Sequence, residues 1–106
     1  MALREITEEQ FRTEVLGSET PVLVDFFATW CGPCRAIAPL LERFAAENAD
    51  RLEMVKLDTD KFEALTEEFG VRTIPTVIAF QGGQELSRVV YPRTMAALKE
   101  LIHTPE

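Results

Sequence analysis

The chain has 106 residues, 46% of them hydrophobic, and its 11 basic and 18 acidic side chains give a net charge of −7. This length and composition predict a single soluble domain over residues 1–106 with a real hydrophobic core. The negative charge and the lack of a basic run argue against nucleic acid or an anionic membrane as partners. No apolar run approaches the roughly 18 residues of a membrane span.

Two features predict a cytoplasmic protein. The first six residues, MALREI, lack the basic-then-apolar pattern of a signal peptide, although a longer precursor would contain the same sequence. Two cysteines are too few for the disulfide framework of a small secreted domain, and in a reducing compartment they would serve as a redox couple. Because no further cysteine is present to link two chains, we also expect a monomer.

The chain begins with a short strand over residues 4–6 and a helix that ends at residues 17–18. Thr7, followed three residues later by Gln10, resembles a capping box at the start of this helix. The apolar residues 22–28 then predict a buried strand.

Helical spacing of apolar residues predicts a second helix from near Pro33 to about Asn48. Pro39, inside this helix, removes one backbone hydrogen bond and should kink it. Residues 52–58 alternate on a period of two and predict a third strand.

Asp60, with Glu63 three residues on, predicts the cap of a third helix that Gly70 ends. A loop over residues 71–75 leads to the last part of the chain. There the sequence predicts a strand at residues 76–80, a tight turn at residues 82–83 and a strand at residues 86–90. A last helix, capped by Thr94, follows. Alternating strands and helices followed by a Gly-Gly hairpin predict an α/β fold with a mixed sheet and helices on both faces.

Both cysteines lie in residues 30–34, WCGPC, where the buried strand meets the second helix. The first turn of a helix presents unpaired N–H groups and a partial positive charge, which stabilise a thiolate and lower its pKa. The three-residue offset brings the second sulfur close to the first. We therefore expect Cys31 at the exposed helix start and Cys34 one turn deeper, as a pair that opens and closes a disulfide by exchange.

Other uses of two cysteines fit less well. A static disulfide that closes so short a loop stabilises a fold weakly. A zinc site needs four ligands, and the only histidine, His103, lies far along the chain. Haem attachment needs a histidine after the second cysteine, where Arg35 stands. We expect no metal and no cofactor.

The WCGPC motif between such a strand and helix resembles the active site of the thioredoxin family, and the resemblance extends along nearly the whole chain. It implies the thioredoxin fold, a mixed central sheet of about five strands flanked by four helices. It also implies a thiol–disulfide oxidoreductase, a dithiol electron carrier that reduces disulfides of client proteins and is recharged by thioredoxin reductase. The Gly-Pro spacer resembles the reducing branch of the family.

The resemblance implies four catalytic residues. Cys31 attacks the substrate disulfide, and Cys34 resolves the mixed disulfide. Asp25, an acid in an apolar strand, lies beneath Cys34 and moves its proton, with a pKa raised by burial. Lys56 matches the lysine that approaches this acid. The alternatives are that backbone donors satisfy Asp25 and that Lys56 is an ordinary exposed side chain.

The resemblance also implies residues that contact the substrate: Trp30, Gly32, Pro33, Ile74, Pro75 and Tyr91. Pro75 looks like the family's cis-proline facing the cysteines, which leaves the backbone of Ile74 to pair with an extended substrate. At Tyr91 the family usually has glycine. Tyr91 and Pro92 either bring a ring and a stiffer loop to the docking surface or are drift in a tolerant loop.

Two other functions remain open at this point. Some thioredoxins are structural subunits of larger assemblies, and nothing in the sequence excludes this role. An isomerase or oxidant of a secretory compartment is a third possibility, but the Gly-Pro spacer and the missing signal pattern argue against it.

Overall fold

The computed structural model describes residues 3–102. His103 and the first two residues of the MALREI segment lie outside the described residues. Five strands form one sheet in the order β1-β3-β2-β4-β5. The strands are β1 (Arg4–Glu5), β2 (Val22–Phe27), β3 (Glu53–Asp58), β4 (Thr76–Gln81) and β5 (Gln84–Val90). β3 pairs in parallel with β1 and β2, whereas β4 pairs antiparallel with β2 and β5. The predicted mixed α/β sheet is confirmed.

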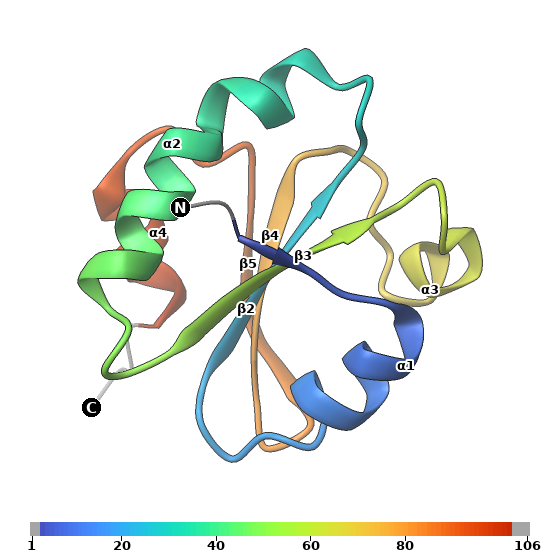
Figure 1. Ribbon diagram of the computed structural model, residues 1–106, viewed down its shortest axis with the longest axis horizontal. Helices are drawn as coiled ribbons and strands as arrows, with labels where there is room; N and C mark the ends of the chain where they lie inside the picture. The colour runs from blue at the N-terminus through green and yellow to red at the C-terminus, as the bar shows by residue number, and fades with distance from the viewer. Residues whose placement is uncertain (1–2, 103–106) are drawn as a thin grey trace.

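Helices cover both faces of this sheet, with α2 and α4 on one side and α1 and α3 on the other (Figure 1). The helices are α1 (Glu8–Gln10), continued by the π-helical turn η1 (Phe11–Val15), α2 (Gly32–Glu47), α3 (Glu63–Glu68) and α4 (Met95–Leu101). Within residues 3–102, no helix combines the length and the hydropathy that crossing a bilayer requires.

The two faces of the sheet bury two separate hydrophobic cores. The first core lies under α1 and α3 and contains Phe11 and Phe80, whose rings meet edge to face at 5.3 Å. The second core lies under α2 and α4 and contains Leu41 and Leu98. Every residue of β2 is buried, because this central strand faces both cores. Its single charged residue, Asp25, is therefore enclosed on the α2 side.

Local signals at three turns are confirmed. The Thr7 hydroxyl accepts the backbone N–H of Gln10, and the Gln10 side chain accepts that of Thr7, as a capping box requires. Gly82 and Gly83 both have positive φ, at 61° and 80°, and close the β4–β5 hairpin. Thr94 caps α4 by accepting the N–H of Ala97.

The predicted cap at Asp60 is wrong. Helix α3 begins at Glu63, follows Phe62 and has no side-chain cap. The preceding turn is instead closed by Asp58, whose buried carboxylate accepts the backbone N–H of Asp60 at 2.8 Å. This turn leaves the Asp60 carboxylate free to accept the indole N–H of Trp30 at 2.7 Å.

Replacing Asp58 should therefore disturb both the fold and the surroundings of Trp30. Asp58→Ala removes the buried acceptor of a partly buried hydrogen bond, and we expect the free energy of unfolding in urea to fall by about 1 kcal/mol. The fluorescence of Trp30 should change as well, because the turn positions Asp60. The control is Asp50→Ala, which removes an exposed acid. Equal stability of the two variants would show that the Asp58 turn contributes nothing.

Candidate active site at the junction of β2 and α2

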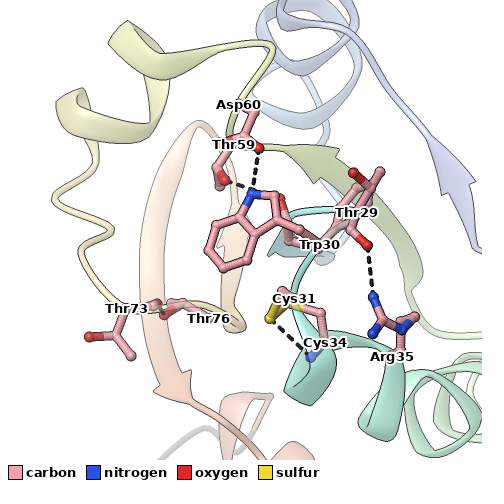
Figure 2. Close-up of a disulfide and its surroundings, with 10 residues drawn as sticks. Thr29, Trp30, Cys31, Cys34, Arg35, Thr59, Asp60, Thr73 and Thr76 are labelled. Atoms are coloured by element: carbon pink, nitrogen blue, oxygen red, sulfur yellow. Dashed lines mark hydrogen bonds between the residues drawn. A yellow bond between two sulfur atoms is a disulfide. The ribbon is translucent and has the colours of Figure 1, made fainter.

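Cys31 and Cys34 form a disulfide at the start of α2, with their Cα atoms 5.3 Å apart (Figure 2). Cys31 is the N-cap of the helix, and its sulfur accepts the backbone N–H of Cys34 at 3.2 Å. Pro33 stands in the first turn, where its missing N–H costs nothing. The sulfur of Cys31 thus occupies the end of the helix where N–H groups and the helix dipole stabilise negative charge.

Both cysteines are buried in this disulfide form. Cys31 is 3% exposed and Cys34 is 6% exposed, so the prediction that Cys31 is the more exposed of the two is wrong for this form. The half-buried Ile74 packs against the pair, together with Phe27 and Ala28 at the end of β2. Position along the helix therefore does not set the accessibility of the two residues, because a neighbouring loop covers them.

Trp30 is the most exposed large hydrophobic residue described, with 67% of its surface accessible. Its indole lies between Cys31 and Asp60, and it donates its N–H to the Asp60 carboxylate (Figure 2). On the helix side, the guanidinium of Arg35 donates to the carbonyl of Thr29 at 2.8 Å. These two bonds fix the loop that leads from β2 into the cysteine motif.

The loop before β4 adds the opposite wall of the site. The Ile74–Pro75 peptide bond is cis, as the resemblance predicted. The Pro75 carbonyl accepts the backbone N–H of Tyr91 at 2.8 Å, which holds the end of β5 beside this loop. Tyr91 is half-buried against the second core, so its ring does not stand free on the surface. The guanidinium carbon of Arg93 lies 4.2 Å from the centre of that ring.

Asp25 is 5% exposed, and among the described residues its Oδ1 is the buried side-chain atom left without a hydrogen-bond partner. Burial raises the pKa of Asp25 to about 7, and the nearby charge of Lys56 lowers this pKa by a smaller amount. The structure thus excludes the alternative in which backbone donors satisfy both carboxylate oxygens. A neutral acid that ionises near pH 7 lies inside the sheet.

Asp25, Cys34 and Lys56 line one cavity of about 260 Å³, which also touches Arg35 and Glu42. Lys56 is the parallel-strand neighbour of Asp25, is half-buried, and holds its ammonium 4.9 Å from the centre of the Phe27 ring. It is therefore not an ordinary exposed lysine. The cavity joins the acid to the second cysteine and has room for water between them.

Comparisons with known proteins agree with this geometry. The thioredoxin family model matches residues 2–104. The chain belongs to the thioredoxin family. The thioredoxin of Mycolicibacterium smegmatis is 48% identical over 95 residues, which cover 88% of this chain and 85% of that protein. Thioredoxin 1 of Nostoc sp. is 43% identical, over 84% of this chain and 83% of that protein.

A further relative is longer. The bifunctional thioredoxin reductase/thioredoxin of Mycobacterium leprae is 50% identical over 94 residues, which cover 89% of this chain but only 20% of that protein. Family membership, the thioredoxin fold and the bonded cysteine pair together define the activity. The chain is a thiol–disulfide oxidoreductase, a protein-disulfide reductase that works through the redox pair Cys31–Cys34.

The site also contains contacts that sequence reasoning missed. Two of these contacts join distant segments of the sequence: the Asp60–Trp30 hydrogen bond and the Lys56 ammonium over the Phe27 ring. The third is the Arg93 guanidinium over the Tyr91 ring, within one loop. Only the oddity of Tyr91 at a glycine position drew attention to one of them. The first two pairs carry no local sequence signal.

The raised pKa of Asp25 predicts a pH-dependent cost in stability. Because the folded chain holds this proton up to about pH 7, whereas an unfolded Asp ionises near 3.8, the cost is absent below pH 4 and grows until about pH 7. Asp25→Asn should remove it. The variant should gain about 4 kcal/mol in unfolding free energy over the parent at pH 8, at about 1.4 kcal/mol per pH unit.

The measurement is a series of urea unfolding curves from pH 4 to pH 8 for the parent and Asp25→Asn. Asp50→Asn, an exposed acid changed in the same way, is the control and should follow the parent at every pH. A stability gain of Asp25→Asn that is the same at pH 4 and pH 8 would disprove the raised pKa.

Proposed function

We propose that the chain is a dithiol carrier that reduces disulfides of client proteins and is returned to its dithiol form by a thioredoxin reductase. The observation that carries the proposal is the disulfide at the start of α2, which shares a cavity with the buried acid Asp25. The relative that joins a thioredoxin reductase to a thioredoxin in one chain supports the choice of reductase.

The same proposal covers the setting of the protein. Residues 1–106 act as a single domain, a view supported by one continuous sheet with a core on each face. The chain works as a monomer in the cytoplasm. A cysteine pair with no third cysteine to link chains, and an activity that suits a reducing compartment, support this setting.

In the first step, the Cys31 thiolate attacks one sulfur of the client disulfide. A bond forms between Cys31 and that sulfur, the client's S–S bond breaks, and the departing client sulfur takes up a proton. The position of Cys31 at the helix N-cap supports its role as the nucleophile. Gly32 and Pro33, both exposed, let the client approach the first turn.

In the second step, Cys34 resolves the mixed disulfide. Its thiol gives a proton to the Asp25 carboxylate through the shared cavity, and the resulting thiolate attacks the sulfur of Cys31. The Cys31–client bond breaks, and the second client sulfur leaves as a thiol once protonated. The client gains two thiols, and the chain gains the disulfide. Lys56 lines the cavity and favours the ionised form of Asp25.

The client is held by the walls of the site. The exposed ring of Trp30 offers apolar contact on one side of the disulfide. On the other side, Ile74 and Pro75 lead into β4, where an extended client segment pairs with the backbone of Ile74. Tyr91, bonded to Pro75, limits how closely that segment approaches, in contrast to the glycine usual there.

The two cysteines should therefore have unequal roles. We expect that the Cys31→Ser variant no longer speeds the reduction of insulin by dithiothreitol. Cys34→Ser should keep the attack and accumulate mixed disulfides with clients, which non-reducing gels and mass spectrometry detect. Capture of clients by Cys31→Ser but not by Cys34→Ser would reverse the assignment. A chain that fails to speed insulin reduction at all would refute the carrier function.

The role of Asp25 predicts a pH profile. Resolution by the parent should speed up as Asp25 ionises, with an inflection near pH 7. In Asp25→Asn the inflection should disappear, and about tenfold or more of the rate at pH 7.5 should be lost, since general-base assistance is worth at least that much. Single-turnover kinetics across pH 6–9 give the measurement. Identical profiles for parent and variant would make Asp25 a structural residue only.

A further inference from the structure

Arg93 presents an exposed guanidinium on the loop that follows β5. The carbon of this group lies 4.2 Å from the centre of the Tyr91 ring. The N–H of Tyr91 is bonded to the carbonyl of Pro75, and the neighbouring Ile74 packs against the disulfide. These contacts connect Arg93 to the loop that packs against the two cysteines.

The backbone of Tyr91 is strained. Its φ of 51° makes it the one non-glycine residue with a positive φ in residues 3–102. A side chain is disfavoured in this region because its Cβ crowds the backbone. Such strain persists only where the surroundings compensate, and it gathers at functional sites. Here the ring is held against the second core and provides the platform for Arg93.

The charge of Arg93 is not neutralised within the protein. Four of the eight arginines pair with carboxylates, namely Arg4, Arg12, Arg43 and Arg88. Among the others, Arg35 and Arg51 donate to the Thr29 carbonyl and the Asn48 side chain. Arg93 has no such partner within residues 3–102, and its printed contact is the Tyr91 ring. In a chain of net charge −7, a guanidinium without a carboxylate partner on the loop after β5 is opposite in sign to the molecule as a whole. It therefore marks a place where a carboxylate from outside fits.

We propose that Arg93, held over Tyr91, binds a carboxylate next to the disulfide of the substrate, so that the chain prefers substrates with an acidic residue at that flank. A guanidinium is planar and pairs with a carboxylate through two N–H groups, and its contact with the ring limits the orientations of that plane. The inference rests on the proposed function and specifies its substrates. On the Trp30 side, by contrast, the carboxylate of Asp60 accepts the indole N–H.

A pair of disulfide peptides that differ only in one flanking residue, Glu or Gln, tests this proposal. The reduced chain converts either peptide disulfide to two thiols while Cys31 and Cys34 form their own disulfide. Rates are followed by chromatography of the reduced peptide at about 0.15 M salt, where charges beyond about 8 Å are largely screened. The ratio of the Glu rate to the Gln rate cancels effects common to both peptides.

In the parent, this ratio should exceed one. Arg93→Gln should lower it about fivefold, the upper range for one exposed ion pair. Arg93→Lys should lower it in part, because an ammonium lacks the planar fork. The matched control is Lys99→Gln, which removes an exposed positive charge from α4 and should leave the ratio unchanged.

Two results would overturn the inference: an equal ratio in the parent and Arg93→Gln, or an equal fall in Arg93→Gln and Lys99→Gln. Either result would leave the proposed function intact, since both peptides would still be reduced. Failure of the parent to reduce either peptide would instead refute the proposed function and the inference with it.

Discussion

The burial of one carboxyl group governs the chemistry of this protein. Asp25 sits in the middle of the central strand, 5% exposed, with one oxygen that accepts no hydrogen bond. An ionised carboxylate in such surroundings is costly, so the group keeps its proton until about pH 7. The cavity shared with Cys34 makes this costly group useful, because an acid that ionises near neutrality accepts and returns a thiol proton. The buried Asp25 therefore lowers the free energy of unfolding near neutral pH, at the position where the reaction needs a base.

Sheet topology brings the other parts of the site to the same place. Strand β2 runs toward the cysteines, whereas the antiparallel β4 starts there, with Thr76 opposite Phe26. Strand β5 returns and ends with Val90 opposite Thr76. The loops before β4 and after β5 therefore meet the start of α2 at one end of the sheet (Figure 1). Segments from three distant parts of the sequence form the site because the sheet is mixed.

Much of this could be predicted from the sequence. The alternation of strands and helices, the capping box at Thr7 and the Gly82–Gly83 turn each depend on residues close together in the chain, so local rules suffice. The arrangement of the strands in the sheet came from the resemblance to the thioredoxin family, because spacing alone does not supply it. The position of Asp25 in an apolar strand already indicated a buried acid. Local rules failed where a tertiary contact decides: Asp58 replaced Asp60 in closing a turn, and the covering loop buried Cys31 as deeply as Cys34.

The most direct test of this account is the titration of Asp25 itself, by carbon-13 NMR of its carboxyl group in the disulfide form of the intact chain. Because desolvation outweighs the charge of Lys56, the account predicts a midpoint about three pH units above the ordinary value, near pH 7. A midpoint near pH 4 would contradict it, since the carboxylate would then be ionised and solvated throughout the physiological range.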